Sequence, residues 1–345
     1  MLNIFNRESI TSAKALVIIS VVLGHILEAI LMSDGEHKIL NGLYQSIYLV
    51  HMPFYFLLSG WLFKGAQPTV KYFVKKIKHL LIPYFTWLII FNSKAIAGFF
   101  ANLIQGNLAG EKALFYKNHF LTQLYGGMEV HGFEMILWFP MCLFFTQQLA
   151  NFIMVKVNKN LIILVVVLAY ILAFVNQYVF PEFHLPLALN IVCGALPLFF
   201  IGFFIKKYSL KSYQVWILVV LCLLTSVIFF VGNFPLTYHM RSAQYGMPVI
   251  SAFAALGGFY IVLFVGNYIS QNKRTFKVLQ YVGKSSMTIM YLHALILIEL
   301  YALNINNIYL LLIIGVLIPT LIHLIMARVN WLSKLFLGEN KLPHN

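Results

Sequence analysis

The feature that most constrains the fold is a series of apolar stretches, each about twenty residues long, separated by short charged segments. An α-helix of this length crosses the hydrocarbon core of a membrane. The stretches do not alternate between polar and apolar residues, so a transmembrane barrel is not expected. With 61% hydrophobic and only 10% charged residues, the chain is not an ordinary soluble domain. We therefore predict an all-α integral membrane protein.

Hydropathy predicts about ten transmembrane helices in a single domain over residues 1–332, followed by a short cytoplasmic tail over 333–345. The first apolar stretch lacks a small-residue cleavage site, so we interpret it as a retained helix. The approximate limits of the predicted helices are 13–32, 43–63, 80–104, 135–155, 160–180, 187–205, 213–233, 247–270, 281–303 and 308–327.

The distribution of charge orients these predicted helices. If the N-terminus is cytoplasmic, all acidic residues except Glu8 and Glu339 face outward. The basic residues then gather on the cytoplasmic side, and the exceptions are Lys38, Lys94, Lys112, Lys117 and Arg241. This asymmetry predicts an even number of helices with both termini in the cytoplasm. It also explains the net charge of +14, so the charge does not predict nucleic-acid binding.

Polar side chains inside the predicted helices are candidates for a functional site, because they are costly at membrane depth. His25 lies eleven residues after Lys14. Eleven residues at 100° each return to nearly the same helix face, about 16 Å further along. The two side chains would share one stripe, which suggests a path through the membrane. Glu28 follows His25 by three residues, so its carboxylate would either orient the imidazole or simply reach the outer headgroups.

Further polar residues fall at a similar predicted depth. They are His51, Asn92, Lys94 and His293, and together with His25 they predict a buried polar chamber in the outer half of the membrane. The longest predicted outer loop, 105–134, is polar and is the best candidate for a lid or an acceptor-binding segment.

Other kinds of chemistry find less support. Ser59 and Gly60 are expected to allow close helix packing or to line a passage, rather than to supply a nucleophile. The three cysteines lie in apolar stretches without the spacing of disulfides or metal ligands. The histidines also lack metal-ligand spacing, so no metal site is predicted.

A dense basic cluster lies in the predicted cytoplasmic loop between the second and third helices. It consists of Lys71, Lys75, Lys76 and Lys78, with His79 beside them. Such a cluster usually meets anionic lipid and fixes the topology. It would equally suit the phosphates of a cytosolic ligand. The residues alone leave both interpretations open.

Taken together, these residues resemble the membrane-bound acyltransferase 3 family, and especially its branch of fucose 4-O-acetylases and other surface-glycan acetylases. The family's first helix carries a basic residue, ten intervening positions and a histidine, which Lys14 and His25 match. Most members have arginine where this chain has Lys14, and many have aspartate at Thr11. Further blocks match in order over about 11–295: HMPFYFLLSGWLF at 51–63, KKIKHLLIPY at 75–84, LWFP at 137–140, YHMRSAQYGMP at 238–248 and VGKSSMTIMYLH at 282–293.

The resemblance implies an O-acetyltransferase of the bacterial cytoplasmic membrane without a bound cofactor. It would move an acetyl group from cytosolic acetyl-CoA to a hydroxyl of a cell-surface polysaccharide or lipid-linked glycan. His25 would be the catalytic base or form an acyl intermediate, with Lys14 and Glu28 in the same catalytic group, and the basic cluster would hold the donor's phosphates. Lysine, unlike arginine, cannot contact a phosphate bidentately. Substrate-binding residues would be His51, Ser59, Asn92, Lys94, Trp138, Arg241 and His293.

Alternatives remain at this stage. The donor could carry a succinyl group instead of an acetyl group, and a transporter for a polar solute or glycan would also need many helices and a polar chamber. Trp138 suits either stacking on a sugar ring or an interfacial belt. Besides acyl-CoA and the glycan, the expected partners are membrane lipids; the sequence does not predict an oligomeric state.

Overall fold

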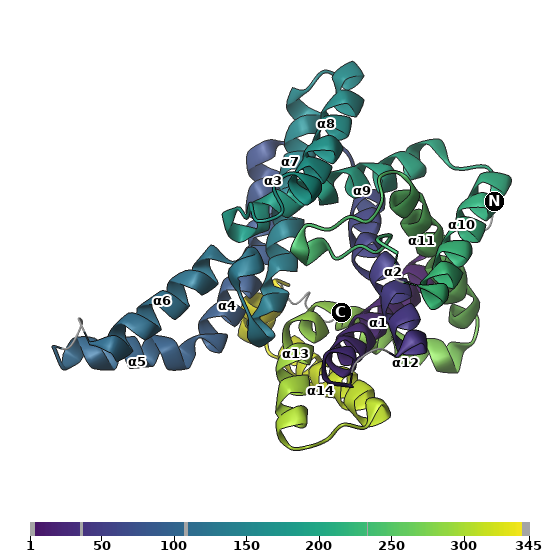
Figure 1. Ribbon diagram of the computed structural model, residues 1–345. Helices are drawn as coiled ribbons and strands as arrows, with labels where there is room; N and C mark the ends of the chain where they lie inside the picture. Colours follow the sequence, from purple (N-terminus) through teal and green to yellow (C-terminus); the bar gives the residue numbers. More distant parts are fainter. Residues whose placement is uncertain (1–3, 35–36, 107–109, 233, 340–345) are drawn as a thin grey trace.

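The structure, a computed structural model, describes residues 4–34, 37–106, 110–232 and 234–339 (Figure 1). Throughout these ranges the chain forms helices, and the one extended pairing is an isolated bridge between His239 and Gln244. The α-helices are α1 (Arg7–Asp34), α2 (Lys38–Leu62), α3 (Thr69–Lys76), α4 (Ile82–Phe91), α5 (Ser93–Ile104), α6 (Glu111–Tyr125), α7 (Trp138–Lys156), α8 (Lys159–Tyr178), α9 (Leu189–Tyr208), α10 (Ser212–Val231), α11 (Ile250–Ser270), α12 (Lys273–Lys284), α13 (Ser286–Ala302), α14 (Ile308–Arg328) and α15 (Asn330–Leu332). Short 3-10 or π turns are η1 (Ile77–Leu81), η2 (Gly127–Glu129), η3 (Gly132–Leu137), η4 (Pro186–Ala188), η5 (Met240–Ser242) and η6 (Ser333–Leu337).

The all-α prediction is confirmed, whereas the number of spans is not. In the described ranges, seven helical segments are long and apolar enough to cross a membrane, or up to nine if each of two bent pairs is one span. The predicted second span, 43–63, falls in α2, which carries several polar side chains and is not among these nine. Ten spans with both termini in the cytoplasm therefore stay a prediction.

Two of the predicted spans are bent. The span expected over 80–104 breaks at Asn92, where α5 turns by 62° from the segment that contains α4. The Asn92 side chain donates a hydrogen bond to the Leu88 carbonyl, a local bond of the kind that competes with helix continuation. As a result, α5 pairs with α6 in a hairpin that projects from the body of the molecule (Figure 1). A second bend of 73° separates α12 from α13.

Helix α2 lies at the centre of the molecule and packs against α1, α9, α10 and α11. Where it crosses α9, a side chain added at Gly60 would meet the carbonyl oxygen of Phe199, and one added at Gly202 would meet that of Leu57. Small residues let membrane helices approach at backbone distance. The close packing expected at Gly60 is therefore confirmed, and it holds the helix that carries His51 firmly in place.

The predicted tail does not extend from the body over its described part. The ring of Phe336 packs against Trp87 of α4 with 5.0 Å between centroids, and the Ser333 hydroxyl donates to the carbonyl of Glu339. Gly338 lies against the backbone of Lys78 and His79, at the basic cluster. Residues 340–345 of the predicted tail lie outside the described residues.

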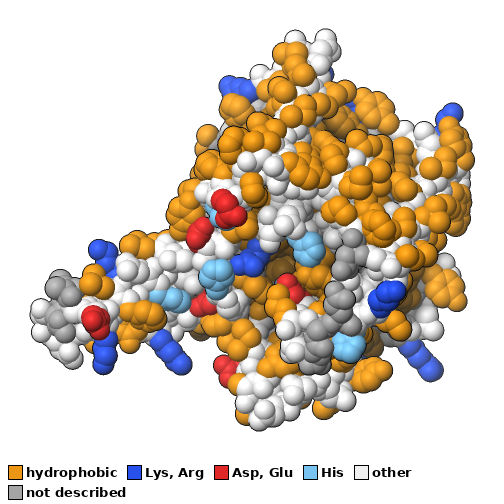
Figure 2. Space-filling view, in the orientation of Figure 1, with side chains coloured by type: hydrophobic (Ala, Val, Ile, Leu, Met, Phe, Trp, Pro, Cys, Tyr) orange, Lys and Arg blue, Asp and Glu red, His pale blue; other side chains and the backbone are white. Residues whose placement is uncertain are grey.

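The surface is mostly apolar, as expected for helices that face lipid. Figure 2 shows hydrophobic side chains over most of this face, with histidine, basic and acidic side chains gathered near its middle. Helices α8, α10 and α14 expose large apolar side chains along their length. The helices packed around α1 and α2 instead enclose polar side chains, among them His25 and His51, and the candidate active site lies between them.

Candidate active site

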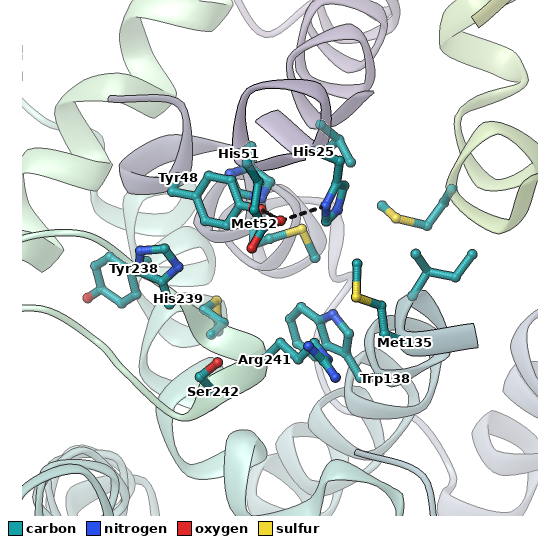
Figure 3. A pocket seen from close by; sticks show the side chains of 15 residues that line it. His25, Tyr48, His51, Met52, Met135, Trp138, Tyr238, His239, Arg241 and Ser242 are labelled. Carbon is teal, nitrogen blue, oxygen red and sulfur yellow. Dashed lines mark hydrogen bonds and ion pairs between the residues drawn. The ribbon is translucent and has the colours of Figure 1, made fainter. Parts of the chain in front are cut away.

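A pocket of about 600 Å³, including its open mouth, lies between α1, α2, the start of α7 and the loop before α11 (Figure 3). We call it the histidine pocket. In Figure 3, His25, Tyr48 and His51 lie on one side, with Trp138 and Arg241 on the opposite side. Its lining comprises Val21, His25, Glu28, Tyr48, His51, Met52, Met135, Ile136, Trp138, Tyr238, His239, Met240, Arg241, Ser242 and Met290.

Glu28 fixes the orientation of His25. The Nδ1 atom of His25 lies 3.1 Å from a carboxylate oxygen of Glu28, and the Tyr48 hydroxyl donates to the same oxygen over 2.8 Å. The Tyr44 hydroxyl lies 3.5 Å from the other oxygen. A carboxylate only accepts, so Nδ1 carries a proton, and in the neutral imidazole the lone pair is therefore on Nε2. The expected side-by-side placement of His25 and Glu28 is thus confirmed, and their catalytic roles stay predictions.

The other two histidines of the predicted chamber are fixed by the backbone. His51 and His293 each place Nδ1 2.8 Å from the carbonyl oxygen four residues earlier, so each donates from Nδ1. The His293 ring lies 5.2 Å from that of His25, and its Nε2 is buried without a hydrogen-bond partner among the described residues. His51 meets the Tyr48 ring edge-on at 4.5 Å. The structure thus brings the three histidines close together, with His25 and His51 lining the pocket and His293 beside His25, and their substrate-binding roles stay predictions. Among the described residues, no group of three His, Cys, Asp or Glu side chains is placed to hold a metal ion.

The loop before α11 supplies His239, which the sequence analysis missed, and Arg241, which it predicted as a substrate-binding residue. The His239 ring lies 4.8 Å from Tyr48 and 5.6 Å from Tyr44. Burial lowers the pKa of His239 below its ordinary value, although Glu28 acts in the opposite direction, so its imidazole is neutral at neutral pH. Arg241 donates from its guanidinium to the carbonyl of Val130, while its Nε is buried with no partner in the described part of the chain.

The sequence analysis also missed Tyr44 and Tyr48, although a signal for them was present in the sequence. Tyr44, Tyr48 and His51 are spaced four and three residues apart, which places them on one face of a helix. His239 stands two residues before Arg241 in the same block, but a loop has no periodicity that would direct its side chain to the site.

Two predicted members of the chamber lie elsewhere. Asn92 is buried at the bend between α4 and α5, where its amide bonds to Leu88. Lys94 is exposed on α5 and does not line the histidine pocket. The 62° bend explains both corrections, because the depth expected for them assumed one straight helix.

Within the predicted outer loop, 105–134, no described residue lines the histidine pocket, and Val130 contacts one of its lining residues. Residues 111–125 form α6, which packs in the hairpin with α5, and 107–109 lie outside the described residues. Met135 and Ile136, which directly follow the predicted loop, do line the pocket, and Val130 accepts a hydrogen bond from Arg241. The segment from 130 to 136 is thus the part that could contact an acceptor.

A second pocket, of about 1030 Å³ including its opening, lies toward the other end of α1, α2, α7 and α13. We call it the lysine pocket, because Lys14, Lys64, Lys75 and Lys76 line it. Its remaining lining residues are Tyr55, Leu58, Ser59, Leu62, Phe63, Gln67, Tyr72, Leu80, Phe139, Leu143, Gln147, Ser286 and Met287.

The lysine pocket divides the predicted basic cluster. Lys75 and Lys76 line it, whereas Lys71 and Lys78 are exposed and do not. Lys64, which was not singled out from the sequence, joins the first pair. Ser59 also lies here, where its hydroxyl accepts a hydrogen bond from Gln147 over 2.7 Å, so it is not placed with the histidines.

The two pockets approach each other along α2 and α13. On α2, Met52 lines the histidine pocket and Tyr55 the lysine pocket, and on α13 Met290 and Met287 do the same. These pairs are separated by about one helical turn, roughly 5 Å. The two pockets are distinct, and the residues of each that lie nearest the other on α2 and α13 are Met52 and Met290, and Tyr55 and Met287, so the structure shows no continuous polar channel from Lys14 to His25. Methionine side chains adapt their shape readily.

Comparison with known proteins identifies the family of the chain. The family described as "Acyltransferase domain" matches residues 7–328, which include both pockets. The chain belongs to the membrane-bound acyltransferase 3 family. Two curated relatives are similar over a shorter region. "Nodulation protein NolL" of Sinorhizobium fredii (strain NBRC 101917 / NGR234) is 30% identical over 100 residues, 28% of this chain and 27% of that protein. "Nodulation protein NolL" of Mesorhizobium japonicum (strain LMG 29417 / CECT 9101 / MAFF 303099) is 30% identical over 86 residues, 24% of this chain and 23% of that protein.

The matches therefore span about a quarter of the length of these relatives. No solved structure matches the chain. For a membrane acyltransferase, the histidine pocket offers a base whose free nitrogen borders a cavity and whose other nitrogen is fixed by a carboxylate. This arrangement is suited to removing a proton from a hydroxyl group.

Proposed function

We propose that the protein transfers an acetyl group from cytosolic acetyl-CoA to a hydroxyl group of a cell-surface polysaccharide or lipid-linked glycan. Family membership supports acyl transfer in a multi-pass membrane protein. The observation that carries the proposal is the placement of an oriented base and a group of lysines in two pockets that share α1, α2, α7 and α13. The base would remove the proton of the acceptor hydroxyl, and the lysines would bind the phosphates of the donor.

The dimensions suit a donor that enters from the lysine pocket. Lys14 and His25 are eleven residues apart on α1, which corresponds to about 16 Å along the helix. The pantetheine arm of CoA spans roughly 15–20 Å by covalent reach. With the phosphates at Lys75 and Lys76, the thioester would reach the histidine pocket between Met52 and Met290. The lysines act as point charges, without the fork geometry of arginine.

In the reaction, Nε2 of His25 accepts the proton of the acceptor hydroxyl as the hydroxyl oxygen attacks the thioester carbonyl. The tetrahedral intermediate then expels the CoA sulfur, which takes the proton from His25. The products are the acetyl ester and CoA with a free thiol. Glu28 holds the imidazole in the required tautomer and stabilises the imidazolium that forms.

Arg241 is suited to the negative charge that develops on the carbonyl oxygen. It lines the histidine pocket, and its Nε has no hydrogen-bond partner among the described residues. Of the predicted substrate-binding residues Asn92, Lys94 and Arg241, only Arg241 lines this pocket. Positioned donors at such a charge commonly contribute about 10²–10³-fold to kcat.

The sidedness of the reaction rests on charge. The excess of basic residues around the lysine pocket would place it at the cytoplasmic face, where acyl-CoA is available, with the histidine pocket toward the outer half of the bacterial cytoplasmic membrane.

The test is turnover of radiolabelled acetyl-CoA by the purified protein in lipid nanodiscs, with base-deacetylated surface polysaccharide as acceptor. We expect transfer of label to the polysaccharide, loss of transfer in His25→Ala, and weaker donor binding in Lys14→Ala. Full turnover and donor binding by both variants would overturn the proposed roles. Succinyl-CoA as a competing donor separates acetyl from succinyl transfer, and glycan transport without turnover would point to a transporter instead.

A further inference from the structure

A third pocket adjoins the histidine pocket on the side of the loop before α11. It encloses about 1140 Å³ including its opening and shares His239 and Ser242 with the histidine pocket. In Figure 3 these two residues lie on the side of the histidine pocket away from Met135. We call it the side pocket. Its other lining residues include Asn176, Gln177, Glu182 and Gln244.

The chemistry of this lining suits carbohydrate. The carboxylate of Glu182, the amide of Gln244 and the hydroxyl of Ser242 can each donate to or accept from sugar hydroxyl groups. The lining contains neither lysine nor arginine, so it offers no cation for a phosphate or a uronic acid. The side chains of Glu182 and Gln244 are exposed at the pocket surface. Without the open mouth its volume is about 560 Å³, within the range typical of ligand sites.

The wall of the side pocket is held rigidly. The side chain of Gln177 accepts from the backbone N–H of Tyr245 over 2.6 Å and donates to the carbonyl of Gly246 over 3.1 Å. Asn176 donates to the carbonyls of Phe180 and Phe183 in the same way. Such bonds pre-form a binding surface, which reduces the entropy lost when a flexible ligand binds.

The backbone of the loop between the two pockets also indicates a pre-formed, rigid binding surface. Ala243 and Val249 adopt positive φ angles of 51° and 67°, which are unfavourable for residues other than glycine. Conformations of this kind persist where the surrounding structure imposes them, and they cluster at ligand sites. The loop therefore holds His239 and Ser242 in fixed positions at the boundary of the two cavities.

We propose that the side pocket binds the sugar unit next to the one that is acylated, so that the acceptor is an oligosaccharide chain with an uncharged or amino-sugar neighbour. This inference rests on the proposed function. The acylated unit lies in the histidine pocket beside His25, and the chain continues past His239 and Ser242 toward Glu182. A single sugar fills only the first of the two cavities and loses the contacts of the second.

The experiment compares acceptors of different length. Fragments of one, two and three sugar units, prepared from base-deacetylated surface polysaccharide of the producing strain, are offered with radiolabelled acetyl-CoA to the full-length protein in nanodiscs. We expect kcat/KM for the acceptor to rise about tenfold or more from one unit to two. Equal kcat/KM for all lengths would overturn the inference and leave the proposed function standing. No transfer to any fragment would overturn the proposed function, and the inference with it.

A matched pair of double variants locates the effect. Glu182→Ala with Gln244→Ala removes two side chains from the side pocket, whereas Glu111→Ala with Gln105→Ala removes the same side chains from the exposed α5–α6 hairpin. The first pair should raise KM for the two-unit acceptor about tenfold, without changing transfer to one unit or KM for acetyl-CoA. The second pair should change none of these. Equal KM values for the two double variants would also overturn the inference.

Discussion

The histidine pocket and the lysine pocket share helices but are built in different ways. In the histidine pocket the polar groups fix one another: Glu28 accepts from His25 and Tyr48, and His51 donates to the backbone. In the lysine pocket, none of the lining lysines has a carboxylate within 4.0 Å among the described residues. Proton transfer depends on the direction of a lone pair, whereas attraction of phosphates depends mainly on charge. The difference indicates where geometry matters in this protein and where charge suffices.

The largest expected effect comes from removing the oriented base. His25→Ala should lower kcat about 10²–10⁴-fold and leave KM for acetyl-CoA nearly unchanged, because the lysine pocket is intact. The measurement is steady-state transfer of labelled acetyl groups, with donor binding followed by isothermal titration. His37→Ala, at the exposed start of α2, serves as the control and should retain wild-type kcat. A kcat within threefold of wild type for His25→Ala would mean that His25 is not the base and that the histidine pocket does not carry out the proton transfer.

The next effect tests whether the carboxylate or merely its shape is needed. Glu28→Gln keeps the size of the side chain but removes the negative charge beside His25. Since that charge stabilises the imidazolium, kcat should fall by about 10²-fold, less than in His25→Ala. Glu8→Gln, an exposed change on the same helix, should have no effect. Wild-type kcat in Glu28→Gln would show that hydrogen bonding alone orients the base.

A third prediction concerns charge in the lysine pocket. Lys75→Gln with Lys76→Gln should raise KM for acetyl-CoA about tenfold, roughly 1.4 kcal/mol, with little change in kcat. The rise should shrink at high salt, because point charges are screened. Lys71→Gln with Lys78→Gln removes the same charge from the same segment but outside the pocket, so KM should stay near wild type. Equal effects of the two pairs would indicate attraction by the whole basic surface rather than by the pocket.

The contrast between the two pockets also explains what could be predicted from the sequence. The convergence of His25, His51 and His293 follows from depth, because a histidine inside an apolar stretch needs polar neighbours and hydropathy gives its level in the membrane. Asn92 and Lys94 were misplaced because their level was counted along a straight helix. The bend at Asn92 arises from a local hydrogen bond, and such competition leaves little trace in a hydropathy profile.

Loops limit prediction in another way. His239 reaches Tyr48 from a loop that is far away in the sequence, and no periodicity directs a loop side chain toward a particular helix. The division of the basic cluster has a similar origin. Lys75, Lys76 and Lys78 are nearly adjacent, and only the turn of α3 against its neighbours decides which of them face the pocket. Composition predicts the presence of the charge, and packing selects the residues.

The smallest predicted effect separates two tyrosines that differ mainly in distance. Tyr48→Phe removes a hydrogen bond of 2.8 Å to the Glu28 oxygen that also binds His25, whereas Tyr44→Phe removes a contact of 3.5 Å to the other oxygen. A hydrogen bond of good geometry contributes about 0.5–1.5 kcal/mol, and contacts near 3.5 Å contribute little. We therefore expect kcat to fall about three- to tenfold in Tyr48→Phe and less than twofold in Tyr44→Phe. KM for acetyl-CoA should change in neither variant, since both tyrosines lie in the acceptor half. Equal losses of kcat in the two variants would show that Glu28 is held by the tyrosine pair as a unit, and a raised KM for acetyl-CoA in Tyr48→Phe would place the thioester closer to this ring than the structure of the two pockets implies.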